Sequence, residues 1–195
     1  IAERPVNVTL ADLERVQRQF TGRIRQVPPM HSALKKDGKA LYEYARAGVE
    51  VERTPRGVEI FTLNLAPTHE GQALTAIKIV ATVSKGTYIR TLGEDIGEAL
   101  GCGAHLGSLR RIETGGLTVD RCVSLGQLEA MTEDERLACL QPVESLLAGH
   151  TPITLGEQDA GRFLSGVRRR GDWADTDTAA VFGDKPRALL GVGHV

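Results

Sequence analysis

The segment from Ile77 to Gly101 constrains the fold most, because in it a strand pattern leads into a helix pattern through one short turn. Apolar residues alternate from Ile77 to Val83, which predicts a half-buried strand. From Thr87 onward they recur every three or four residues, which predicts a helix with one buried stripe that ends at Gly101. We expect an α+β fold, in which helices flank part of a mixed, mainly antiparallel sheet.

Local patterns mark the other elements. Thr9 followed by Asp12 resembles a capping box and predicts a helix of about three turns. The pair Asp37-Gly38 predicts a tight turn, and the residues after it predict a short helix over 40–47. The remaining predictions are a strand over 57–66, a turn over 69–72, strand and turn over 105–120, and helix starts at Ser124 and Thr132.

The character of the sequence changes after Gly149. The residues that follow contain one short helical piece and brief strands interrupted by Gly, Asp and Pro. We therefore predict a larger domain over 1–148 and a small β-rich unit over 149–195.

Composition excludes several classes of protein. The three cysteines form no Cys-x-x-Cys pair, so we expect neither a disulfide framework nor a zinc knuckle, and the expected compartment is a reducing cytoplasm. No apolar run approaches the roughly 18 residues that span a bilayer, so no membrane partner is expected. The five histidines have no metal-ligand spacing, and no metal site is predicted.

Basic residues are clustered although the net charge is only −1. Most short basic clusters are solvated faces, so alone they only weakly indicate nucleic-acid binding. The clusters are Arg23, Arg25, Lys35, Lys36 and Lys39, then Arg110–Arg111, then Arg168–Arg170.

The side chains of Tyr88 and Arg90, at the turn before the helix, allow a structural and a functional interpretation. In one, Arg90 pairs with Glu94 one helical turn away, and Tyr88 covers the core with its phenol in water. In the other, Gly86 allows close backbone approach, Tyr88 offers a flat face to a base, and Arg90 offers a bidentate fork to an anion. Spacing alone leaves both readings open.

Two stretches carry a resemblance to a known family: QVPPMHSALKKDGKALYEYARAG and VSKGTYIRTLGEDIGEALGCGAHLGSLRR. In this order and spacing they resemble the TruB family of tRNA pseudouridine synthases, from about residue 1 to residue 147. The remainder is similar, more weakly, to that family's small PUA-like RNA-binding domain, here truncated. The resemblance implies the second half of a pseudouridine synthase sheet.

The resemblance also implies residue roles. It matches Tyr88 to a tyrosine lining the pocket of a flipped-out uridine, Arg90 to the arginine that pairs with the catalytic aspartate, and Leu109 to a leucine that touches the base. It implies base flipping in the T arm of tRNA without metal or organic cofactor, by a protein that is a monomer in full-length form. A thumb-like insertion would cover about 28–57, and the implied RNA contacts are Lys35, Lys36, Lys39, Lys85 and Arg110.

One motif of the family is missing from the sequence. The nucleophilic aspartate lies in a Gly-Ala-Leu-Asp-Pro-type motif that does not occur in these 195 residues. We therefore expect the C-terminal portion of such an enzyme, and a chain that is inactive alone. The alternatives are a non-catalytic RNA-binding module that uses Arg168–Arg170 and the insertion lysines, or a structural domain with a solvated Arg90–Glu94 pair.

Overall fold

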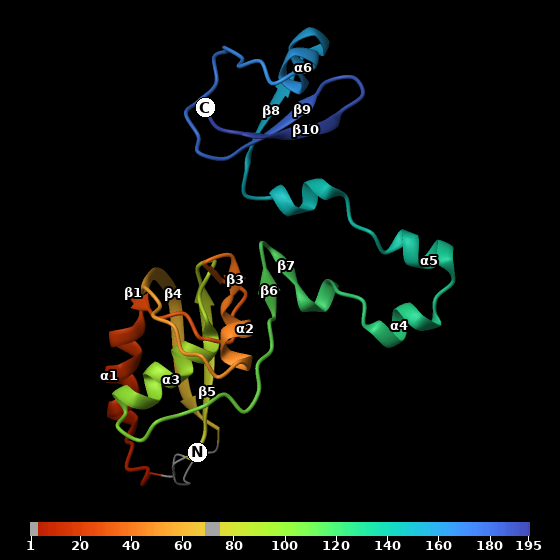
Figure 1. Cartoon of the computed structure of the whole chain (residues 1–195). Helices are drawn as coiled ribbons and strands as arrows, with labels where there is room; N and C mark the ends of the chain where they lie inside the picture. The colour runs from red at the N-terminus through yellow and green to blue at the C-terminus, as the bar shows by residue number, and fades with distance from the viewer. Residues whose placement is uncertain (1–3, 69–74) are drawn as a thin grey trace. The chain divides into compact units, whose positions relative to one another are not determined.

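The computed structural model describes residues 4–68 and 75–195, in two compact units, Ile1–Leu109 (unit 1) and Arg110–Val195 (unit 2). The predicted turn over 69–72 lies outside the described residues. The predicted α+β class is confirmed (Figure 1). Unit 1 contains, in chain order, α1 (Leu10–Phe20), β1 (Gly22–Gln26), β2 (Lys35–Lys36), β3 (Lys39–Ala40), α2 (Leu41–Arg46), β4 (Arg56–Pro67), β5 (Ile77–Val83) and α3 (Ile89–Ala99).

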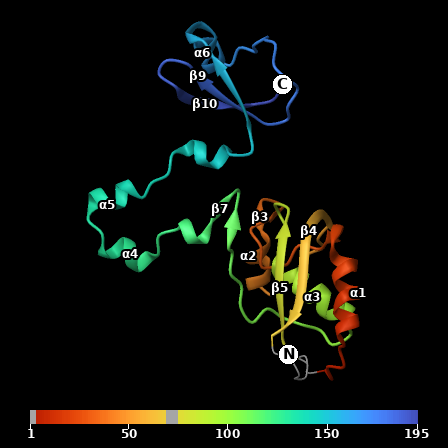
Figure 2. The same cartoon turned by 180° about the vertical axis from the view of Figure 1, so that it is seen from behind.

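The main sheet of unit 1 has the strand order β1-β4-β5, and both pairings are antiparallel. Residue Ile24 lies opposite Val58, and Leu65 lies opposite Ile79. A register shift follows Ile60, so the inward positions of β4 pass from Ile60 to Leu63. Helices α1 and α3 cover one face of this sheet (Figure 2).

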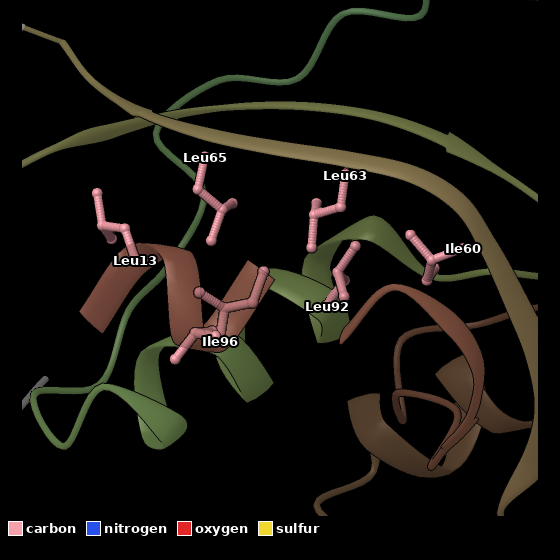
Figure 3. Close-up of a cluster of buried hydrophobic side chains, with 7 residues drawn as sticks. Leu13, Ile60, Leu63, Leu65, Leu92 and Ile96 are labelled. Carbon is pink, nitrogen blue, oxygen red and sulfur yellow. The ribbon is translucent and has the colours of Figure 1, made fainter. Parts of the chain in front are cut away.

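The core of unit 1 lies between that face and the two helices. In Figure 3, side chains of β4 point toward α1 and α3, whose own apolar side chains meet them. Ile60 and Leu92 are fully buried, as expected for alternation on a strand and a buried stripe on a helix. Burying one such side chain stabilises the fold by about 1.5–3 kcal/mol. The cluster consists of Leu13, Val16, Ile60, Leu63, Leu65, Leu92 and Ile96.

The segment between β1 and β4 folds back on itself. Strands β2 and β3 form a hairpin whose two turn residues, Asp37 and Gly38, have φ values of +52° and +79°, which suits the predicted tight turn. Helix α2 follows at the predicted place. At the base of the segment, Arg53 Nη1 donates to the carbonyl of Pro28 at 3.2 Å and ties its two ends together.

Unit 2 has a three-stranded sheet of order β10-β9-β8, in which β8 runs parallel to β9 and β10 runs antiparallel to it. Its core packs Ile153, Leu155 and Val181 against Phe163 of α6 and Trp173. Capping boxes at Ser124 and Thr132 start α4 and α5 as predicted. The elements are β6 (Glu113–Thr114), β7 (Leu117–Thr118), η1 (Val119–Arg121), α4 (Leu125–Ala130), α5 (Glu133–Ala138), η2 (Val143–Leu147), β8 (Thr151–Leu155), α6 (Glu157–Leu164), β9 (Ala179–Gly183) and β10 (Ala188–Gly193).

Within the ranges 4–68 and 75–195, every helix is too short or too polar to cross a bilayer.

Candidate functional site

The turn between β5 and α3 is held by hydrogen bonds from its own residues. Ser84 extends the β4–β5 pairing, since its N–H donates to the Glu59 carbonyl at 2.8 Å and its Oγ accepts the Glu59 N–H at 2.9 Å. The Thr87 hydroxyl donates back to the Ser84 carbonyl at 2.9 Å. Gly86 has φ +88°, a conformation that L side chains rarely adopt. The chain can therefore reverse within five residues and enter α3.

Gln26, at the end of β1, holds the residue that starts the helix. Its side-chain Oε1 accepts the backbone N–H of Tyr88 at 2.9 Å, and its Nε2 donates to the carbonyl of Tyr88 at 3.1 Å. The side chain of Tyr88 is half-buried, and that of Gln26 is 2% exposed. Two segments 62 residues apart are thus joined directly at the start of α3.

Arg90 lies in the first turn of α3 with its side chain exposed. Its Nη2 donates to the backbone carbonyl of His31 at 3.2 Å, in the segment that follows β1. The Arg90–Glu94 ion pair of the structural reading is not formed, and no carboxylate among residues 4–68 and 75–195 lies within salt-bridge distance of Arg90. Most of the guanidinium fork remains available to an anion.

The loop after α3 packs closely on the helix. A Cβ added to Gly97 would lie 2.2 Å from the backbone N of Ala104, and one added to Gly93 would lie 3.1 Å from Leu106. This loop leads to Leu109, which is 63% exposed at the end of unit 1. The contact of Leu109 with a base stays a prediction.

The hairpin lysines differ in their surroundings. Lys36 Nζ donates to the Glu52 carbonyl at 3.0 Å, and Lys39 Nζ lies 4.9 Å from the centre of the Tyr44 ring. Lys35 is exposed. Lys36 and Lys39 therefore also stabilise the insertion, and Lys39, like Lys35, is exposed.

Two further predicted RNA contacts lie at exposed positions. Lys85 is at the tip of the turn that Ser84 and Thr87 close. Arg110 is the first residue of unit 2. Exposure is compatible with phosphate contact, and their contact with RNA stays a prediction.

The three arginines 168–170 are not equivalent. Arg169 is paired with Asp159 of α6 and only 18% of its side chain is exposed, so it anchors a loop of unit 2. Arg168 and Arg170 are exposed. The cluster therefore offers two cations to a partner instead of three.

The electrostatics of α3 include one carboxyl with a shifted pKa. Burial raises the pKa of Asp95, and the neighbouring charge of Glu94 raises it further. An open hollow of about 510 Å³ is lined by residues of β1 and β4, among them Arg23 and Arg25, and by Ser84 at the start of the turn. The part of the chain that the structure describes contains no group of three His, Cys, Asp or Glu side chains that could hold a metal ion.

Gln26 is the site residue that the sequence analysis missed. The alternation of β1 provides the signal, because Gln26 shares the inward face with Ile24, and Ile24 packs against the core of unit 1. A polar residue at an inward strand position must have a hydrogen-bond partner when it is buried. The pattern cannot identify that partner.

Comparison with known families gives matches to consecutive parts of the chain. Residues 1–89 match the family model described as TruB family pseudouridylate synthase (N terminal domain). Residues 90–148 match the one described as tRNA pseudouridylate synthase B C-terminal domain. The two matches meet between Ile89 and Arg90, inside the candidate site.

Curated relatives match most of the chain. A tRNA pseudouridine synthase B of Verminephrobacter eiseniae is 59% identical over 98% of this chain and 58% of its own length. Proteins of the same name from Ralstonia nicotianae and Ralstonia pickettii are 54% and 49% identical, over 86% and 98% of this chain and 54% and 63% of theirs. The chain thus spans less than two thirds of these relatives.

Two solved structures share the fold. A chain of a Cbf5-Nop10-Gar1 complex matches with a TM-score of 0.69 and 22% identity, over 97% of this chain and 56% of that one. A chain of an H/ACA RNP bound to a substrate RNA containing 2′-deoxyuridine matches with a TM-score of 0.64 and 19% identity, over 96% and 55%. At these identities the likeness supports the α+β fold alone.

Proposed function

Since the chain belongs to the TruB family of pseudouridylate synthases, we propose that the whole protein converts a T-loop uridine of tRNA to pseudouridine. The reaction is an isomerisation: the bond from the sugar to N1 of uracil breaks, the base turns, and a bond from the sugar to C5 forms. The proton on C5 is lost and N1 gains one, so atoms balance without a co-substrate.

The observation that carries the proposal is the environment of Arg90. Its guanidinium is exposed at the start of a rigid helix, with one hydrogen bond to His31 and no carboxylate partner in the described ranges 4–68 and 75–195. A nucleophilic carboxylate must stay ionised, and a guanidinium beside it lowers its pKa and fixes its orientation. We assign Arg90 to an aspartate supplied from outside these residues.

Tyr88 and Leu109 would form walls of the pocket for the extruded base. Extrusion costs a few kcal/mol of unstacking, and aromatic or apolar walls recover part of that cost. The half-burial of Tyr88 leaves part of its ring accessible, and Leu109 is exposed, which supports this assignment.

RNA outside the pocket would be bound through phosphates. Lys35, Lys36, Lys39, Lys85 and Arg110 are the proposed contacts with the T arm, all independent of sequence and weakened by salt. We place the thumb-like insertion at about 28–57, in agreement with the Arg53–Pro28 hydrogen bond at its base.

The domain limits, compartment and oligomeric state are also proposals. The catalytic portion would extend over 1–148 and the PUA-like unit over 149–195, which fits a family match that ends at residue 148 and a strand that begins at Thr151. A tRNA substrate favours the cytoplasm, and we propose a monomer in the full-length form.

Tritium release tests the function. The complete gene product is incubated with a tRNA transcript labelled at C5 of uridine, and released tritium is measured together with RNA binding. We expect stoichiometric release, because the new bond replaces the C5–H bond. Tight binding without release would favour a non-catalytic RNA-binding module.

A further inference from the structure

The buried amide of Gln26 makes a two-point contact with one backbone unit. Its oxygen accepts from the Tyr88 N–H at 2.9 Å and its nitrogen donates to the Tyr88 carbonyl at 3.1 Å. A single hydrogen bond leaves a residue free to rotate about it, whereas two hydrogen bonds to one residue also fix the orientation of that residue.

The contact falls on the residue that starts α3. Tyr88 is the N-cap of the helix, and its side chain makes no capping hydrogen bond. The Tyr88 carbonyl also accepts the first helical hydrogen bond, from the Leu92 N–H at 3.0 Å. The Tyr88 N–H, by contrast, has Gln26 as its acceptor, so loss of Gln26 would leave a part-buried donor without this partner.

Both predicted site residues depend on this N-cap. The direction of the Cα–Cβ bond of Tyr88, from which its ring extends, follows from its φ of −95° and ψ of 105°, and the contact with Gln26 holds this backbone. The side chain of Arg90 projects from the helix two residues after the N-cap, so a shift of the N-cap would also move its guanidinium. Arg90 donates to the carbonyl of His31, and His31 lies in the segment that follows Gln26. The two contacts therefore brace the start of α3 against one segment.

We propose that Gln26 is a positioning residue for catalysis, which sets the Tyr88 ring and the Arg90 guanidinium in register with the reacting base. This inference rests on the proposed function. Gln26 touches neither substrate nor nucleophile and acts through the backbone of Tyr88. Misplacement of reacting groups by about 1 Å can cost about a hundredfold in rate, so the effect should be on turnover more than on binding.

The test compares Gln26→Met with Gln17→Met in the complete gene product. Gln17 is a matched control, because its Oε1 accepts the backbone N–H of Leu65 at 3.0 Å, on β4 and away from the start of α3. Both variants lose a side-chain acceptor for a backbone donor. We expect kcat of Gln26→Met to fall by about a hundredfold with KM for tRNA within about twofold, and kcat of Gln17→Met to stay within about twofold of wild type.

A second variant, Gln26→Glu, supplies a pH-dependent readout. A protonated glutamic acid reproduces both contacts, since its hydroxyl donates to the Tyr88 carbonyl and its other oxygen accepts the Tyr88 N–H. An ionised carboxylate cannot donate. The activity of Gln26→Glu relative to wild type should therefore rise as the pH falls, and on the acidic side it should exceed that of Gln26→Met.

Amide exchange separates this inference from the proposed function. In Gln26→Met the Tyr88 amide should exchange at least about tenfold faster than in wild type and in Gln17→Met. If wild type releases no tritium, the proposed function fails, and exchange alone then decides whether Gln26 holds the turn. A Gln26→Met variant with kcat within about twofold of wild type, or with unchanged Tyr88 exchange, overturns the inference, as does a Gln26→Glu variant that acid does not restore.

Discussion

Within residues 4–68 and 75–195, the Arg90 guanidinium makes one hydrogen bond, to the backbone carbonyl of His31. A lysine could reach the same carbonyl but could not present a planar fork to a carboxylate, so Arg90→Lys is conservative for the fold and not for the chemistry. We expect Arg90→Lys to lower kcat by about a hundredfold or more. Since the side chain is exposed, the free energy of unfolding should change by less than about 0.5 kcal/mol.

Tritium release and urea unfolding of the complete protein measure the two quantities. Arg18→Lys is the control, because Arg18 is an exposed arginine of α1 whose side chain forms, within the described ranges, a 3.8 Å ion pair with Glu14. Equal turnover in Arg90→Lys and Arg18→Lys would contradict the assignment of Arg90.

Asp95 predicts a pH dependence of stability. Burial, and then Glu94, raise its pKa above the ordinary value of 3.8, so the folded state binds the proton more tightly than the unfolded state. This contribution favours folding most at pH values below 3.8 and is lost as the pH rises through the folded pKa. Asp95→Asn should therefore be more stable than wild type at neutral pH, and the difference in the free energy of unfolding should vanish below pH 3.8.

Urea unfolding at neutral pH and below pH 3.8 checks this expectation. Glu94→Gln should stabilise at neutral pH by less than Asp95→Asn, because the charge of Glu94 is the smaller of the two causes. A loss of stability in Asp95→Asn at neutral pH would contradict it.

At the scale of elements, α3 can approach its following loop because Gly97 has no side chain. A methyl group there would lie 2.2 Å from the backbone N of Ala104. Overpacking against backbone cannot be relieved by a side-chain rotation, so Gly97→Ala should destabilise unit 1 by about 3 kcal/mol. Amide exchange of β4 residues measures this, since the single tryptophan, Trp173, lies in unit 2.

Gly161→Ala is the matched substitution in another helix. Gly161 lies inside α6, and nothing comes within 4 Å of an added Cβ. Helix propensity then dominates, and unit 2 should gain about 0.5–1 kcal/mol, measured by Trp173 fluorescence in urea. Similar effects of the two substitutions would mean that the close approach at Gly97 does not form.

Elements whose boundaries depend on nearby residues could be predicted from the sequence. The capping box of Thr9 and Asp12 starts α1, and Asp37-Gly38 closes the β2–β3 hairpin, because each hydrogen bond or turn spans only a few residues. The contact between Gln26 and Tyr88 joins residues 62 apart and depends on how β1 lies beside β4. Such contacts follow from the path of the chain, which local patterns do not specify.

The same limit applies to the candidate site. The motif resemblance predicted site roles for Tyr88 and Arg90, which lie within two residues of each other on one turn. It could not identify the His31 carbonyl as a partner of Arg90, or show that Lys36 is bonded to the Glu52 carbonyl. Residue types carry the chemistry, whereas their partners are set by packing.

At the scale of the whole molecule, the chain spans 58% of the Verminephrobacter relative and lacks a Gly-Ala-Leu-Asp-Pro-type motif. Arg90 has no carboxylate partner within residues 4–68 and 75–195. A guanidinium and a pocket wall can bind and orient a base, but neither can attack the sugar. We therefore propose that the 195 residues position the base and that the nucleophile is supplied from outside them.

We expect the 195-residue chain alone to release no tritium from a C5-labelled tRNA transcript, under conditions in which the complete gene product turns over. RNA binding measured on the same samples should remain detectable and should weaken with salt, because Lys35, Lys85 and Arg110 are exposed cations that this chain retains. The control is the chain with these three residues changed to alanine, which should bind more weakly and with a smaller salt dependence. Turnover by the chain alone would require a nucleophile within these residues and would remove the reason for assigning Arg90 to an external aspartate.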